Sequence, residues 1–182
     1  HGCLVGSEMC IRDSTGAVYL ITFDQTTNSN GDASTDFDNP THVGTLGSGY
    51  STLAKSISGW KAGQVAIDGD GNRLAIGHHN EEDVRVFGFE DTSLNGASLQ
   101  FTIGIGQTGS NSVNATSHGV EDGDGFPNVI ALDDTGTLMA IGSTGDDGLD
   151  NDDVPGTDAG AVYLWSDTIM QGATSYTNFA SD

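Results

Sequence analysis

The chain is poor in cysteine and in basic residues, and each shortage excludes a class of protein. Its two cysteines, Cys3 and Cys10, lie within the first 13 residues, so the rest of the chain holds no disulfide, thiolate zinc site or cysteine nucleophile. Lys and Arg number 5 against 26 Asp and Glu, which gives a net charge of −21, and no Lys or Arg follows Arg85. Such a surface repels nucleic acid and anionic lipid and favours bound cations.

Long hydrophobic runs and helix signals are also missing. No stretch of about 18 apolar residues occurs, so the sequence predicts no membrane-spanning helix and no membrane insertion. There is no long 3.6-residue apolar periodicity, and 27 glycines help to separate short runs rich in Val, Ile, Leu and aromatics. This pattern predicts an all-β protein. We expect strands near residues 16–23, 43–47, 63–68, 73–77, 84–89, 99–104, 128–133, 137–142 and 160–165.

What the sequence does contain is an internal repeat. Residues 65–77 (VAIDGDGNRLAIG) match residues 130–142 (IALDDTGTLMAIG) without a gap, and the phrase GAVYL at 16–20 returns at 160–164. Recurrence at a long period indicates a repeat architecture. Each unit is interpreted as four antiparallel strands, A to D. In the third unit, strands B and C are nearly continuous apolar runs, which are typical of sheets covered on both faces. The sequence therefore predicts the blades of a β-propeller rather than a sandwich with one wet face.

The repeat also predicts the domain organisation. We expect residues 1–13, which resemble a translated sequencing adapter, to be an artefact outside the fold. The chain opens with His1 and shows no closing element at its end, which suggests an internal fragment of a longer protein. About two and a half blades are expected, fewer than the roughly four to eight of closed propellers, so neighbouring blades of the same longer chain are expected partners. The expected units are residues 14–59 (strands C and D of one blade), 60–104 (a complete blade), 105–125 (an acidic connection) and 126–182 (a third, incomplete blade).

The recurring phrases resemble the FG-GAP repeats, the integrin-α-like β-propeller repeats, in their bacterial form. In the third unit these phrases are Gly125-Phe126, residues 130–132, residues 139–142, the loop 145–148 and residues 160–165; in the second they are Gly59-Trp60, residues 65–67, 74–77 and 84–87. The chain departs from the family where Lys61 and Pro127 replace a glycine. The resemblance covers about residues 16–167. It implies an extracytoplasmic or cell-surface protein, often calcium-binding, with roles in adhesion or matrix.

Acidic residues concentrate in two connections that blade topology places on one face, residues 104–125 and 142–160. Carboxylate and amide oxygens at short spacing suit calcium, which takes about six to eight oxygen ligands in flexible loops. The alternative interpretation is a solvated acidic loop whose Asp and Gly only set turns. The candidate calcium ligands are Asp146, Asp147, Asp150, Asn151, Asp152, Asp153, Asp158, Glu121, Asp122 and Asp124.

The turns between strands A and B, residues 68–72 in the second unit and 133–137 in the third, are weaker candidates for calcium sites. We call them the A–B turns. The metal site of the family implies ligands at Asp68, Asp70 and Asn72, but Arg73 stands at the glycine position and no closing acid follows. These turns are therefore interpreted as plain hairpins. The pair His78-His79 beside acidic residues could hold a transition metal, although a solvated polar loop is favoured. His118 is interpreted as a loop residue.

The functional hypothesis is a non-enzymatic, calcium-assisted binding or adhesion module, extracellular or at the cell surface, within a larger secreted bacterial repeat protein. Calcium is the only cofactor expected, and the partners expected are an extracellular protein, a glycan or matrix. No nucleophile elbow, P-loop or zinc-protease motif occurs, so no catalytic residue is assigned. Two alternatives remain open: an accessory propeller of a secreted polysaccharide-acting hydrolase, and a ligand-free spacer in a giant surface protein.

Overall fold

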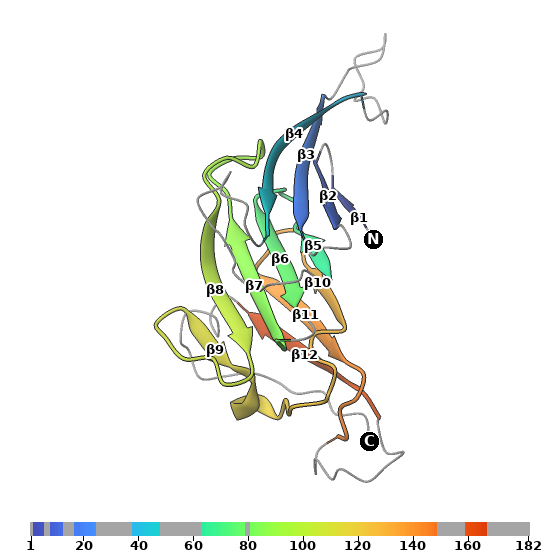
Figure 1. The fold of residues 1–182 in the computed structure, drawn as a ribbon, viewed down its shortest axis with the longest axis vertical. Helices are drawn as coiled ribbons and strands as arrows, with labels where there is room; N and C mark the ends of the chain where they lie inside the picture. Colours follow the sequence, from blue (N-terminus) through green and yellow to red (C-terminus); the bar gives the residue numbers. More distant parts are fainter. Residues whose placement is uncertain are drawn as a thin grey trace.

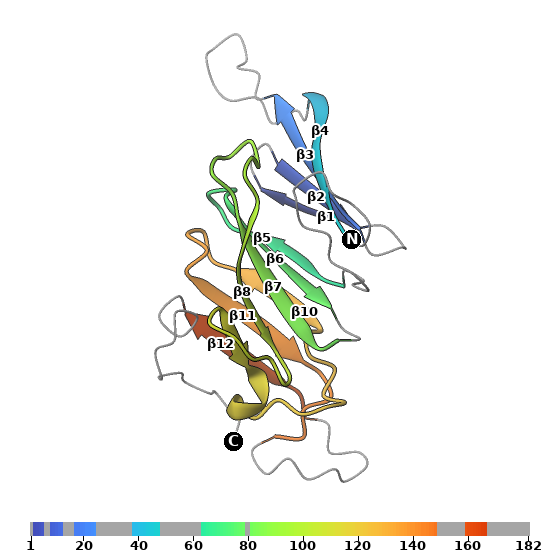
Figure 2. The same ribbon diagram turned by 60° about the vertical axis from the view of Figure 1, so that its left-hand side comes forward.

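In the described residues the fold consists of three sheets stacked face to face along the long axis of the molecule, antiparallel except for one short strand (Figures 1 and 2). In the part of the chain that the structure describes, the only helix is one short 3-10 turn. That part holds no helix long and apolar enough to cross a membrane. The structure, a computed structural model, describes residues 2–5, 8–12, 17–24, 38–47, 63–78, 81–148 and 159–166.

The first sheet contains four strands in chain order, and its first two were not expected. We expected residues 1–13 to lie outside the fold, whereas two segments of this stretch pair as a hairpin and extend the sheet from β3. Such pairing needs only backbone N–H and C=O groups, which any extended segment offers. It does not test where the stretch comes from. The strands are β1 (Gly2–Val5), β2 (Glu8–Arg12), β3 (Val18–Asp24) and β4 (Asp38–Leu46).

The second sheet is the most complete. Four antiparallel strands follow one another, and a short fifth strand, β9, pairs parallel to β8. The 3-10 helix η1 (Ala115–His118) follows directly, with the side chain of Asn114 accepting the Thr116 N–H at its start. The sequence did not predict β9 or η1, because three half-buried residues show no periodicity. The strands are β5 (Val65–Ile67), β6 (Arg73–His78), β7 (Asp83–Gly88), β8 (Ser98–Gly104) and β9 (Ser112–Asn114).

The third sheet contains three strands within the described residues: β10 (Val129–Leu132), β11 (Leu138–Ser143) and β12 (Ala161–Ser166). A fourth strand near residues 176–179 was expected to be poor, and it lies outside the described residues. All nine strands expected from the sequence are present, and most of their ends agree within two residues. The exception is β4, which begins at Asp38 rather than near 43.

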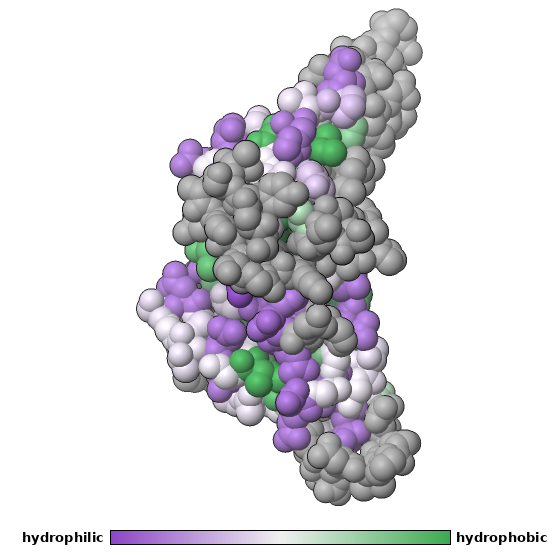
Figure 3. Space-filling model, viewed as in Figure 1, coloured by the Kyte–Doolittle hydropathy of each residue, from purple (hydrophilic) through white to green (hydrophobic). Residues whose placement is uncertain are grey.

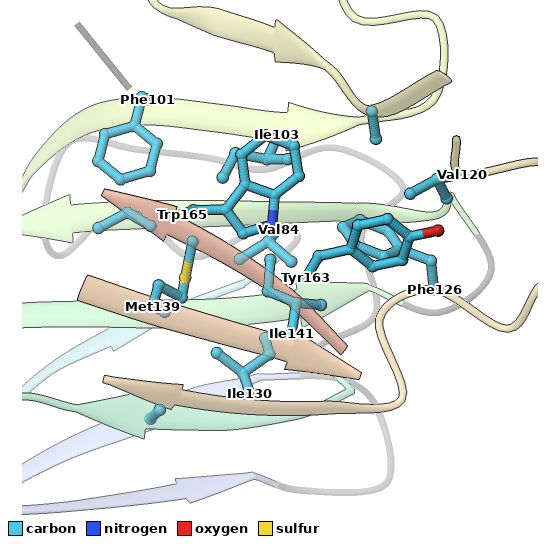
Figure 4. Packing of buried hydrophobic residues seen from close by; sticks show 14 residues of the cluster. Val84, Phe101, Ile103, Val120, Phe126, Ile130, Met139, Ile141, Tyr163 and Trp165 are labelled. Atoms are coloured by element: carbon cyan, nitrogen blue, oxygen red, sulfur yellow. The ribbon is translucent and has the colours of Figure 1, made fainter. Parts of the chain in front are cut away.

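The sheets are held together by two clusters of buried side chains. One lies between the first and second sheets and includes Leu20, Leu46, Leu74 and Phe87. The other lies between the second and third sheets (Figure 4), where Trp165 and other side chains of the third sheet pack toward the second. Strand β5 lies against both β1 and β10, so the first strands of the three sheets adjoin. Sheets that stack face to face and adjoin at their first strands are consecutive propeller blades, as the repeat predicted.

Alternation along each strand explains why the repeat builds this stack. Successive side chains of a strand point to opposite faces of a sheet. In β6, Leu74 and Ile76 pack toward the first sheet, while Ala75 joins the cluster shared with the third. Between the second and third sheets, small residues thus meet large ones. Because such a strand is buried on both faces, its sequence is a near-continuous apolar run.

Candidate functional site: the acidic loop face

Two long connections meet at one end of the second and third sheets, as blade topology predicted. One connection, residues 105–128, joins the second sheet to the third, and the other runs from β11 to β12. The Gly145 N–H donates to the carbonyl of Asp124 at 2.7 Å, and the Ser143 hydroxyl donates to the same oxygen at 2.9 Å. We call the described parts of these connections, residues 105–128, 144–148 and 159–160, the acidic loop face.

Glycine makes the approach between the two connections possible. A Cβ on Gly145 would lie 3.0 Å from the carbonyl oxygen of Gly123 and 3.1 Å from the carbonyl carbon and oxygen of Asp124. These are backbone atoms, which cannot rotate away as a side chain could. Gly145 therefore fixes how closely the two acidic segments lie.

Two of the predicted ligands, Asp124 and Asp146, are buried at this junction, and the fold supplies donors to both carboxylates. Asp124 accepts the Glu121 N–H at 2.7 Å. Asp146 accepts the Gly148 N–H at 2.9 Å on one oxygen and the Tyr163 hydroxyl on the other. These contacts hold the two carboxylates in fixed positions without neutralising them.

The electrostatics of the junction disfavour the charge on Asp124. Burial raises the pKa of its carboxyl, and the nearby negative charges of Asp146, Glu121 and Asp147 raise it further, while the hydrogen bond from the Glu121 N–H acts in the opposite direction. No basic residue is among the causes that shift the pKa of Asp124. The junction is therefore a place where acids repel one another and where a cation would relieve the repulsion.

The other predicted ligands of this face are only partly placed. Glu121 and Asp122 are exposed, and Asp147 is half-buried. Asp150, Asn151, Asp152, Asp153 and Asp158 lie outside the described residues. Within the described residues, no three His, Cys, Asp or Glu side chains lie together as a metal site. The described carboxylates therefore do not form a complete ligand set for a metal ion.

The A–B turns face the opposite end of the sheets, and the weaker candidate ligands there do not converge. Asp68 is 1% exposed, and one of its oxygens accepts the backbone N–H groups of Asn72 and Arg73 at 3.0 Å each. Its second oxygen is buried with no hydrogen-bond partner. Asp70 and Asn72 are exposed, and Asn72 contributes its backbone rather than its side chain. The geometry is that of the plain hairpin that the sequence indicated.

Adjacent turns also contact each other, which the sequence did not indicate. The Asp70 N–H donates to the carbonyl of Asp134 at 3.0 Å, and the Arg73 guanidinium donates to the carbonyl of Gly136. Gly136 has a φ of +64°, and a Cβ there would lie 2.8 Å from the unpartnered oxygen of Asp68. Glycine is therefore required at this position by both conformation and space.

The histidines differ from the sequence interpretation. His78 is 2% exposed and pairs across strands with Asp83, which is also buried and accepts hydrogen bonds from Arg85 at 3.1 and 3.2 Å. The expectation of a solvated loop is therefore wrong for His78 and Asp83, which are both buried. His118 lies in η1, not in a loop, and its ring meets Trp165 edge-on at 5.0 Å. Burial lowers the pKa of His118.

Tyr163 was not singled out from the sequence. Its ring packs edge-on against Phe126 at 6.2 Å (Figure 4). Its hydroxyl donates a hydrogen bond to Asp146. A signal was present, because a tyrosine at the centre of a buried strand needs a partner for its hydroxyl and the nearest acidic segment is the preceding loop.

Comparison with known proteins identifies no family. No family model matches the sequence, and no curated protein matches it. The resemblance to FG-GAP repeats therefore stays a prediction. Among solved structures, the fold is similar to the β-propeller domain of Myceliophteria thermophila Cps50 (Swd1), with a TM-score of 0.48 and 11% identity. That match covers 78% of this chain and 33% of the other, so the chain spans about a third of its length.

Proposed function

We propose that this chain is a non-enzymatic binding module of β-propeller blades in which calcium assists binding at the acidic loop face. The observation that carries the proposal is the junction of Asp124 and Asp146, two buried carboxylates held by the fold with further acids around them. Carboxylates kept close at a cost in repulsion are better explained by a cation than by turn formation alone.

The remaining ligands would come from the same two connections. Glu121, Asp122 and Asp147 belong to this face, and the acidic run 150–158 continues from it in sequence. Calcium accepts irregular sets of carboxylate, amide and carbonyl oxygens, so two fixed carboxylates within irregular acidic connections suit it better than magnesium, which demands octahedral geometry. The partner class of extracellular protein, glycan or matrix, and the location outside the cytoplasm, follow from the FG-GAP resemblance.

Calcium titration by calorimetry, with melting curves on the same samples, tests the proposal. We expect saturable binding and a rise in melting temperature, because a ligand that favours the native state stabilises it. Magnesium at equal concentration should bind more weakly. Asp124→Asn and Asp146→Asn should each weaken calcium binding by about tenfold or more, since each removes one charged ligand.

A matched control is Glu90→Gln, which makes the same charge change on an exposed side chain in the turn between β7 and β8, at the other end of the sheets. It should leave calcium binding unchanged. If a folded sample shows no heat and no thermal shift with calcium, or if all three variants bind calcium alike, the acids of this face are a solvated surface and the proposal fails.

A further inference from the structure

The third sheet presents an apolar face that no described segment covers. Four of the five large hydrophobic residues that are exposed in the described chain lie on it: Val129, Leu138, Val162 and Leu164. Cross-strand register confirms that they share one face, since Val129 and Val162 both pair with Gly142 and Leu164 pairs with Ala140. We call these four residues the outer face of the third sheet, which is the last layer of the stack in Figure 2.

The repeat shows that this face occupies a position that is buried elsewhere in the same chain. Val162 is equivalent to Val18 and Val84 in the two preceding sheets, where both are 0% exposed, but Val162 itself is 52% exposed. Leu164 is likewise equivalent to Leu20 and Val86, both 0% exposed, and is 43% exposed. The equivalent positions are thus buried in the first and second sheets and exposed in the third.

The structure also shows what kind of surface covers such a face. On the second sheet, the equivalent residues Val84 and Val86 pack in one cluster with Met139, Ile141 and Trp165 of the third sheet. The approach is close, because a Cβ on Gly77 would lie 2.7 Å from Pro127 and 2.8 Å from Ile130. The partner of the outer face is therefore a sheet that presents large apolar and aromatic side chains against small ones.

The first sheet of the same chain carries such side chains on its far side. In β3, Tyr19 and Ile21 alternate with the buried Val18 and Leu20, so they point away from the second sheet. By the repeat they are equivalent to Tyr163 and Trp165, the residues with which β12 covers the second sheet. Both are half-buried. The two ends of the stack are thus complementary to each other.

We propose that the outer face of the third sheet binds the first sheet of a second copy of this chain, head to tail, and that two copies close into one ring. The described part of each copy contributes three sheets, so two copies supply six, within the range of about four to eight blades that closed propellers use. A heterologous contact of this kind closes only if the rotation per sheet permits, and otherwise yields open filaments. The charge of −21 per copy opposes association at low salt, so the ring is favoured when the charges are screened.

Sedimentation velocity of the full chain over a range of concentrations, at low and at high sodium chloride, tests the proposal. We expect a concentration-dependent dimer that is stronger at high salt and does not grow further. The double variant Val162→Asp/Leu164→Asp should be monomeric, and the milder Val162→Thr/Leu164→Thr should weaken the dimer if the charged variant fails to fold. The control Leu99→Asp, at the exposed large hydrophobic residue of the second sheet, should dimerise like the unchanged chain.

Mixing distinguishes head-to-tail binding from pairing of two like faces. Ile21→Asp should also be monomeric, whereas a mixture of this variant with Val162→Asp/Leu164→Asp should form a one-to-one dimer, because one of the two contacts is intact. An unchanged chain that stays monomeric at every concentration would overturn the proposal, and the face would then be covered by another part of the chain or by a further blade. Open-ended growth, or an Ile21→Asp chain that dimerises alone, would overturn the closed ring as well.

Discussion

At the scale of single residues, Asp68 and Asp133 show how one repeat position takes on opposite electrostatic behaviour. Burial raises the pKa of Asp68, although hydrogen bonds from the backbone of Arg73 and Asn72 offset part of the effect. The Leu138 N–H and the Thr135 hydroxyl lower the pKa of Asp133, whose turn has no following blade against it within the described residues. Both turns begin with the same residue, but the neighbouring turn buries Asp68 and the charge of Asp70 raises its pKa further. At the position equivalent to Asp70, Thr135 instead donates a hydrogen bond to Asp133.

This contrast predicts opposite pH dependence for two matched substitutions. A raised pKa means that Asp68 contributes most to stability below its ordinary value of 3.8 and that this contribution is lost as the pH rises through the raised value. Asp68→Asn should therefore gain stability relative to the unchanged chain as the pH increases. A lowered pKa means that Asp133 contributes above 3.8 and loses that contribution as the pH falls, so Asp133→Asn should cost more stability at neutral pH than in acid.

Urea unfolding of the three chains between about pH 3 and about pH 7 measures both effects as free energies of unfolding. The measurement compares each variant with the unchanged chain at the same pH, so other titrating groups cancel. If both variants changed with pH in the same direction, the burial of Asp68 under the neighbouring turn would not be the cause.

The bond from Tyr163 to Asp146 gives a second prediction at this scale. Tyr163→Phe keeps the ring contact with Phe126 but removes a donor from a buried carboxylate, which should cost about 1–3 kcal/mol in the free energy of unfolding. Urea unfolding provides the measurement. In the background of Asp146→Asn the cost of Tyr163→Phe should shrink, and an undiminished cost there would show that the hydroxyl stabilises something other than Asp146.

At the scale of the elements, the junction between sheets depends on small residues facing large ones. Gly77 and Gly142 occupy the same repeat position in β6 and β11. An added Cβ on Gly77 meets Pro127 and Ile130 of the next sheet, whereas on Gly142 it meets only a methyl of Val129, a side chain that is 56% exposed. The same glycine is therefore under different constraint in the two sheets.

Gly77→Ala should lower the free energy of unfolding by about 1–3 kcal/mol, because overpacking a covered junction forces the next sheet to shift. Gly142→Ala should cost much less, since the exposed Val129 side chain can rotate away. Thermal or urea unfolding of the pair measures the difference. Equal costs would mean that the outer face of the third sheet is as tightly covered as the junction itself.

The elements were largely predictable from sequence, and the exceptions have physical reasons. The nine expected strands were visible because each carries a short apolar run between turn residues. β9 was not visible, since three half-buried residues show no alternation, and β1 and β2 had been set aside for the suspected origin of their sequence rather than for their pattern. In the candidate site, the meeting of the two acidic connections followed from strand order, but the burial of Asp124 and the partner of Asp146 did not.

At the scale of the whole molecule, the dominant feature is the net charge of −21, carried by a fold whose sheets are held together by apolar clusters. Hydrophilic residues cover most of the described surface on the face seen in Figure 3, with hydrophobic residues in small patches. Self-repulsion of this kind destabilises the compact state and is screened by salt, because the Debye length falls from about 30 Å at 0.01 M to about 3 Å at 1 M.

The melting temperature should therefore rise by several degrees as sodium chloride increases from about 0.01 M to about 1 M. Tetramethylammonium chloride at the same ionic strength separates screening from specific ion binding, because screening depends on ionic strength and not on the identity of the cation. Differential scanning calorimetry gives the measurement. A melting temperature that falls or stays constant with salt would show that the acids do not repel one another strongly in the folded chain.

The sequence by itself determined the all-β class, the strand order and the blade-like stacking, because strands with near-continuous apolar runs require a sheet on each side. It also determined that two acidic connections share one end of the sheets. Only the tertiary structure decided which acids are buried, which tyrosine holds Asp146, and which of three equivalent valines is exposed. These outcomes depend on which side chains the neighbouring sheet places against each position. The repeated sequence has similar residues at equivalent positions whether or not a neighbouring sheet is present, so it cannot show which of them are covered.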